Sequence, residues 1–88
     1  MKLLIAVVQT ADSNAVADAL IEQGFRVTKL ASTGGFLRRG STTLLLGVED
    51  DQVDQAIEII RSECSQPAEP AIKQGAIFVL PVSRFEQV

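Results

Sequence analysis

The fold is decided by the stretch Lys2-Leu-Leu-Ile-Ala-Val-Val-Gln9, a continuous apolar run with several β-branched side chains. Such a run is typical of a central strand that is buried on both of its faces. The leucine-rich residues 42–48 and the segment 76–80, which Pro81 closes, predict two more strands. Residues 25–32 predict a further strand of alternating pattern, in which Phe25, Val27, Lys29 and Ala31 share one face and Arg26, Thr28, Leu30 and Ser32 share the other.

A helix is predicted between the first two strands, over residues 13–23. Asp12 or Ser13 can cap its N-terminus, because either side chain accepts hydrogen bonds from the free backbone N–H groups of a first turn. Gly24 suits the left-handed position just past the helix end. The residues expected to face the core recur at helical spacing: Val16, Ala17, Leu20 and Ile21.

A second helix is predicted to begin at Asp50, and its buried stripe consists of Val53, Ile57, Ile60 and Cys64. The element order is then β-α-β-β-α-β, which specifies an α+β, ferredoxin-like sandwich: a four-stranded antiparallel sheet with two helices on one face. A length of 88 residues fits one domain over 1–88. The first and last strands are apolar on both faces, so self-association through the uncovered sheet face is expected.

Composition excludes several classes of protein. With 47% hydrophobic and 22% charged residues, the chain is expected to fold rather than to remain disordered. It contains one cysteine and no histidine, so neither a disulfide framework nor a metal site is predicted. The apolar opening is too short to cross a membrane and no small-residue cleavage site follows it, so a cytoplasmic protein without a membrane partner is expected.

Charge is distributed unevenly along the chain. Residues 26–48 contain four basic side chains and no acidic one, whereas the other four basic side chains are spread among all eleven acidic ones. One basic segment on an acidic body argues against binding to nucleic acid, which uses a broad basic face, and suits a compact anion held at one place. The alternative is a basic hairpin that merely balances an acidic helix surface.

Nothing in the sequence resembles a catalytic constellation. There is no histidine to act as a base, and Cys64 lies on the predicted buried stripe of the second helix. An acylphosphatase on this fold needs an arginine that holds phosphate and an asparagine that follows it, but the only asparagine is Asn14 in the first helix. The protein is therefore not expected to be an enzyme.

The segment 33–41 is predicted to be a glycine-rich loop with ligand-binding potential. Gly34 and Gly35 permit positive φ and expose backbone N–H groups that can bind an anion. Phe36 offers an aromatic face to a base, and Arg38 and Arg39 offer guanidinium donors to phosphate. The alternative is a hairpin whose Phe36 and Leu37 dock on the sheet or on a neighbouring subunit.

Several stretches closely resemble the PII-like cyclic di-AMP receptor family, which consists of PII-like signal transduction proteins. The matching stretches cover almost the whole chain in order: Lys2–Gln9, Phe25-Arg-Val-Thr-Lys-Leu-Ala-Ser-Thr-Gly-Gly-Phe-Leu-Arg38, Gly40-Ser-Thr-Thr43, Gly47-Val-Glu-Asp-Asp51 and Phe78-Val-Leu-Pro-Val-Ser-Arg-Phe-Glu-Gln87. The resemblance implies a non-catalytic homotrimer without a cofactor. Each subunit would bind cyclic di-AMP, or a related adenine nucleotide, in clefts between subunits and relay the bound state to an unidentified protein partner.

The same resemblance implies which residues line the cleft. The matching positions are Arg26, Thr28, Gly35, Phe36, Leu37, Gly47, Phe78 and Gln87, and Ser41 stands where ligand-binding members have asparagine. Those members also carry a long insertion between the second helix and the last strand, a gap that only residues 65–74 fill here. The alternative function is a trimeric protein-interaction module that binds no nucleotide.

Overall fold

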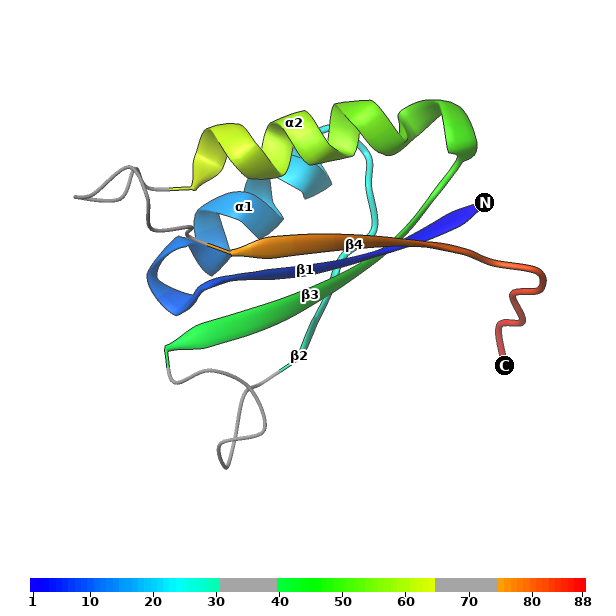
Figure 1. Ribbon diagram of the computed structural model, residues 1–88, viewed down its shortest axis with the longest axis horizontal. Helices are drawn as coiled ribbons and strands as arrows, with labels where there is room; N and C mark the ends of the chain where they lie inside the picture. The colour runs from blue at the N-terminus through cyan, green and yellow to red at the C-terminus, as the bar shows by residue number, and fades with distance from the viewer. Residues whose placement is uncertain (31–39, 65–74) are drawn as a thin grey trace.

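The computed structural model describes residues 1–30, 40–64 and 75–88 (Figure 1). Its elements confirm the predicted β-α-β-β-α-β order and the α+β, ferredoxin-like fold class. In chain order they are β1 (Lys2–Gln9), α1 (Thr10–Glu22), β2 (Thr28–Leu30), β3 (Ser41–Val48), the 3-10 turn η1 (Asp50–Gln52), α2 (Val53–Glu63) and β4 (Ala76–Pro81). The predicted loop at 33–41 and the connector at 65–73 fall almost entirely outside the described residues.

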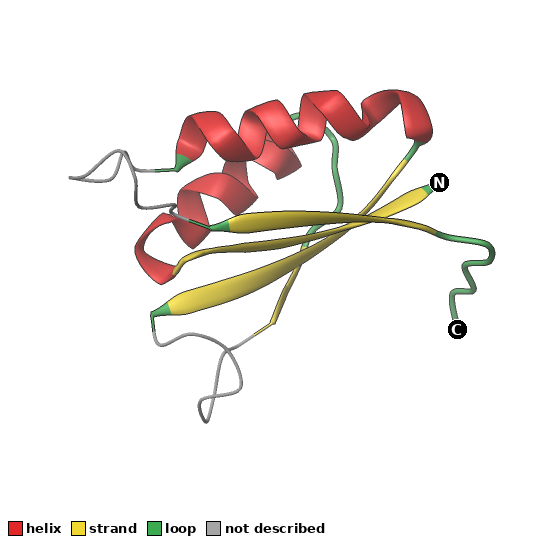
Figure 2. Cartoon of the chain, in the orientation of Figure 1, coloured by secondary structure: helices red, strands yellow, loops and turns green. Residues whose placement is uncertain are grey.

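The four strands form one antiparallel sheet in the order β2-β3-β1-β4, so β1 and β3 are central and β2 and β4 are the edges. Strand β1 pairs with β3 from Lys2↔Val48 to Gln9↔Ser41, and with β4 from Lys2↔Pro81 to Val7↔Ala76. Both helices lie on the same face of this sheet (Figure 2). The other face is not covered by either helix.

The core lies between the sheet and the two helices. Leu4, Ala6 and Val8 of β1 point into it, and each is almost fully buried. The alternate residues of β1, Leu3, Ile5 and Val7, are only half-buried, because they point to the uncovered face. The remaining buried apolar residues of the core are Val16, Leu20, Phe25, Leu44, Leu46, Val48, Ala56 and Ile60.

A glycine ends α1 and sets the direction of the chain into β2. Gly24 has φ +91°, and its N–H donates to the Ile21 carbonyl oxygen at 2.9 Å. The N–H of Phe25 donates to the Leu20 carbonyl oxygen at 3.0 Å, which completes a Schellman motif and buries Phe25 beside Leu20 in the core. This confirms the prediction for Gly24.

The predicted alternation after Gly24 is also confirmed. Phe25 and Val27 pack into the core, whereas Arg26 and Thr28 are exposed. The described strand β2 covers only Thr28–Leu30 of the predicted 25–32.

The start of α1 differs from the prediction. The helix begins at Thr10, directly after β1, and its N-cap residue Gln9 makes no side-chain capping hydrogen bond. Asp12 and Ser13, the expected caps, lie inside the first turn and are buried, and the Ser13 hydroxyl donates to the Thr10 carbonyl oxygen at 2.9 Å. The prediction was wrong because no loop separates the strand from the helix.

Two residues of the predicted α1 stripe, Val16 and Leu20, are buried as expected, but Ile21 is not. The stripe runs from Asp12 and Ser13 through Val16 to Leu20, so Ile21, expected in the core, lies beside the stripe and is 56% exposed. In α2 the predicted stripe is nearly right. Ile60 is buried and Val53, Ile57 and Cys64 are partly buried against the core, with Ala56 as an additional buried residue.

We predict that Gly75→Ala separates the start of β4 from β1. A Cβ atom on Gly75 would lie 2.0 Å from the Val7 carbonyl oxygen, and backbone must move to relieve that overlap. We expect the free energy of unfolding to fall by about 1–3 kcal/mol, the usual range for overpacking, in urea denaturation. Gly47→Ala is the matched control, because a Cβ there has only the Met1 Sδ near it, at 4.0 Å. Equal stability of the two variants would contradict this account.

Candidate functional site

The candidate site lies on the sheet face that the helices leave uncovered. Directly paired residues of neighbouring antiparallel strands point to the same face, so the strand register sorts the side chains into transverse rows. One such row on the uncovered face runs across all four strands: Thr28, Leu45, Ile5 and Phe78. Two of the predicted ligand residues, Thr28 and Phe78, therefore occupy the same row at opposite edges of the sheet.

Of the other predicted residues, Gly47 and Ser41 lie on the same face of the sheet and Gln87 lies in the tail. Gly47 lies in the next row, beside Leu3, and Ser41 lies at the other end of β3, beside Gln9. Gln87 is exposed in the tail that follows β4. Gly35, Phe36 and Leu37 lie outside the described residues.

The spacing shows that one chain does not bring these residues together. Thr28 and Phe78 are separated by three strand spacings, or about 14 Å at ~4.8 Å per strand. Ser41 and Gly47 are six residues apart on β3, or about 20 Å at ~3.4 Å per residue. Sorted by strand, the described residues form two groups, one along β2 and β3, where Ser41 is far from Gly47, and the other on β4 and the tail.

The two described cations of the acid-free segment differ in what they face. Arg26 is exposed between two core residues, and it forms no ion pair with the part of the chain that the structure describes. Lys29 points to the opposite side of the sheet, where its Nζ donates to the Asn14 Oδ1 of α1 at 2.5 Å. The charge of Lys29 is therefore directed away from the uncovered face. The number of basic residues in the segment is larger than the positive charge that this face receives.

The surface of the uncovered sheet face between Thr28 and Phe78 is apolar. Leu3, Ile5 and Leu45 are half-buried there, and Phe78 and Leu80 on the edge strand are 55% and 43% exposed. Sequence reasoning predicted that β1 is apolar on both faces but gave Ile5 and Leu45 no part in the site. Their place between Thr28 and Phe78 depends on the strand register, which residue types do not reveal.

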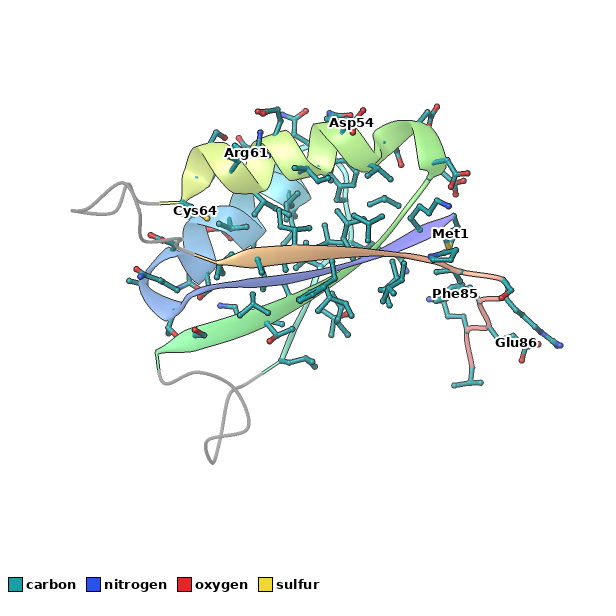
Figure 3. All side chains as sticks on the ribbon, viewed as in Figure 1. Met1, Asp54, Arg61, Cys64, Phe85 and Glu86 are labelled. Carbon is teal, nitrogen blue, oxygen red and sulfur yellow. The ribbon has the colours of Figure 1, made fainter. Side chains whose placement is uncertain are left out.

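Cys64 has the environment of an unreactive thiol. It is the C-cap residue of α2, partly buried against the core (Figure 3). Burial raises the pKa of the Cys64 thiol, and the nearby carboxylates of Asp12 and Glu63 raise it further. The thiol is therefore protonated at neutral pH, and no cation among the described residues lowers its pKa as in a nucleophilic cysteine.

Residues 1–30, 40–64 and 75–88 contain neither a metal-binding cluster nor a membrane-spanning helix. No group of three or more histidine, cysteine, aspartate or glutamate residues is placed to hold a metal ion there. Neither described helix combines the length and the apolar character that a membrane-spanning segment requires.

Fold and surface together define a small α+β sandwich whose uncovered sheet face carries the candidate binding residues. A family model described as "Cyclic-di-AMP receptor" matches residues 1–69, and the chain belongs to this PII-like family of nucleotide-binding signalling proteins. The matched range contains every predicted ligand residue except Phe78 and Gln87.

The chain is also similar to a crystal structure described as that of a functionally unknown protein from Pediococcus pentosaceus ATCC 25745. The two sequences are 38% identical, the TM-score is 0.81, and the match covers 99% of this chain and 96% of the other. This similarity extends over β4 and the tail, where the family model does not reach.

We predict that Cys64 reacts slowly with iodoacetamide at neutral pH. Because its pKa lies above the ordinary thiol value, the fraction of reactive thiolate is smaller in the folded chain than in the unfolded one. The alkylation rate, followed by mass spectrometry, should rise with pH and reach its midpoint at a higher pH than in urea-unfolded protein. A folded rate at neutral pH equal to the unfolded rate would show that the thiol is not protected.

Proposed function

We propose that this protein is a non-catalytic, cytoplasmic signalling protein that binds cyclic di-AMP, or a related adenine nucleotide, in clefts between the subunits of a homotrimer. The bound state is relayed to a partner protein. Membership of the cyclic di-AMP receptor family supports the class of ligand. The single observation that supports a cleft between subunits is the separation of Thr28 and Phe78 at opposite edges of one sheet.

The separation of the two groups favours a ring of identical copies. A base cannot lie on Phe78 while its own phosphate reaches Thr28 across about 14 Å of the same sheet. The β4 edge of one copy can instead approach the β2 edge of the next, so that each cleft takes Phe78 from one subunit and Thr28 from its neighbour. Such a contact joins two different surfaces, and contacts of that type close into rings when the rotation permits. The family resemblance implies three copies.

Association of this kind also explains why the uncovered face is apolar. Half-buried Leu3, Ile5 and Leu45, together with the exposed Phe78 and Leu80, form an apolar surface that soluble monomers rarely leave open. Packing copies against one another removes this surface from water, with a gain of ~25 cal/mol for each Å² of apolar area buried.

On the phosphate side, the proposed contacts come from the group on β2. The Arg26 guanidinium is exposed, and it supplies charge and hydrogen-bond donors to a phosphate. Thr28 adds a hydroxyl donor on the uncovered face. Backbone N–H groups near Gly35 complete this set, in the segment outside the described residues.

On the base side, the proposed contacts are mainly aromatic and backbone. Phe78 and Phe36 offer ring faces to adenine. Gly47 carries no side chain on the uncovered face, so a ring can approach the β3 backbone closely. Gln87 and Ser41 offer donor and acceptor groups to a base edge, and Leu37 adds an apolar wall.

Isothermal titration against cyclic di-AMP, ATP, ADP and AMP tests the proposed function, and Arg26→Ala tests its phosphate contact. We expect cyclic di-AMP or a related adenine nucleotide to bind, and Arg26→Ala to weaken that binding by about 1.5–3 kcal/mol, the range for a charged hydrogen bond. Lys29→Gln is the matched control, because Lys29 is held at Asn14 on the other side of the sheet and should not affect affinity. Absence of heat with all four ligands at high micromolar concentration would leave the interaction module as the function.

Mixed trimers test whether the cleft lies between subunits. Thr28→Ala and Phe78→Ala should each abolish or strongly weaken binding, because each removes one side of every cleft. After co-refolding of the two variants, every mixed trimer has one junction with both native residues, so titration should recover binding. No recovery would place both residues in the same subunit's site. A monomer in light scattering at all concentrations, with and without nucleotide, would exclude the ring.

A further inference from the structure

Thr43 is a polar residue on the uncovered face whose hydroxyl has no hydrogen-bond partner among the described residues. It lies on β3 opposite Val7 of β1 and Leu30 of β2, and only 4% of its surface is exposed. Its Oγ1 atom is buried and unsatisfied. The adjacent residue, Thr42, points to the helix side, where its Oγ1 is 2.9 Å from the Thr10 Oγ1. Two neighbouring threonines therefore differ sharply in how their hydroxyls are used.

A buried hydroxyl without a partner is uncommon in native structures, because its hydrogen bond to water is lost and nothing replaces it. Valine has nearly the same shape and would avoid this cost. Since the cost of removing the Thr43 hydroxyl from water is already met when the chain folds, a new hydrogen bond to it brings more free energy than one to an exposed hydroxyl. Because no described residue supplies that bond, a ligand can supply it.

The position of Thr43 connects it to the candidate site. On the uncovered face of β3 it lies between Ser41 and Leu45, each two residues away. Its cross-strand neighbour is Leu30, so Thr28 lies on the diagonal, at about 7 Å. On the uncovered face Thr43 thus lies between two proposed ligand residues, Thr28 and Ser41. These two are themselves about 14 Å apart, because Ser41 is four residues from Leu45, the partner of Thr28, at ~3.4 Å per residue.

We propose that Thr43 is a further ligand-binding residue whose hydroxyl contacts the edge of the nucleotide base; this inference rests on the proposed function of the same face. Its neighbours Val7, Leu30 and Leu45 are apolar, which favours a flat, uncharged base over a phosphate. A hydroxyl both donates and accepts, so it matches a base edge that places a ring nitrogen beside an amino group. Leu30 is 43% exposed on a three-residue edge strand, and its side chain can move aside to admit the base.

The test compares Thr43→Val with Thr42→Val in nucleotide titration and urea denaturation. We expect Thr43→Val to weaken the binding of cyclic di-AMP by about tenfold, the loss typical of one neutral hydrogen bond, while the fold is as stable as wild type or more stable. Thr42→Val should do the opposite: it breaks the bond to Thr10 and lowers stability, while affinity stays near that of wild type. Thr43→Ser keeps the hydroxyl and should retain most of the affinity.

Each contrary result has a defined meaning. If wild type binds and Thr43→Val binds equally well, or if Thr43→Val loses stability as Thr42→Val does, the hydroxyl has its partner within the protein and the inference is wrong. If Thr43→Val changes the oligomeric state in light scattering without changing affinity, the partner is a neighbouring subunit and the inference is again wrong. If wild type binds no nucleotide, the proposed function itself fails.

Discussion

Strand β1 is hydrogen-bonded along both edges, and this double pairing determines where the candidate site residues of β3 and β4 lie. Its pairing with β3 puts Gly47 beside Leu3 and Ser41 beside Gln9, and its pairing with β4 puts Phe78 beside Ile5. A shift of one residue in either pairing would turn the whole partner strand over, so that its core residues faced the uncovered side. The register is held because Leu4, Ala6 and Val8 must all enter the core against the helices. The packing of the core face of the sheet thus determines which residues lie on the uncovered face.

The same pairing places the two groups of candidate residues at opposite edges of the sheet. Because β1 and β3 are central, β2 and β4 cannot meet within one chain. Helix α1 follows β1 without a loop, and the Schellman motif at Gly24 then leads the chain into the edge strand β2. Arg26, just before β2, is directed outward. A ligand that needs residues from both edges therefore needs more than one copy of the chain. In the proposed function, oligomerisation and ligand binding both follow from this one sheet topology.

Local patterns predicted the elements well, because hydrophobic periodicity and turn residues act within a few positions. The double-faced apolar run of β1, the alternation at 25–28 and the left-handed Gly24 each have a local cause that the sequence displays. The N-terminus of α1 was predicted wrongly from local patterns. Asp12 and Ser13 have side chains that can cap a helix, but the helix begins before them, so they lie buried in its first turn. Which edge a residue occupies, and which hydroxyl lacks a partner, depend on pairings between distant segments. Neither Ile5 between Thr28 and Phe78 nor the unsatisfied Thr43 has a local signal.

The distribution of charge also makes the uncovered sheet face suitable for an anionic ligand. None of the described strands contains an aspartate or glutamate, whereas η1 and the helices carry most of the described carboxylates. On α2, Asp54 lies on the side away from the sheet (Figure 3), and the Asp50 carboxylate at the start of η1 is 3.0 Å from the Met1 ammonium, which lowers the pKa of Asp50. A phosphate that approaches the sheet face thus meets no carboxylate on the described strands, and the exposed Arg26 is close to β2. Of the described cations of the basic segment, Arg26 alone is directed away from the acidic helices, since Lys29 bonds to Asn14 of α1. The position of Arg26 therefore suits the proposed binding of an anion by an acidic protein.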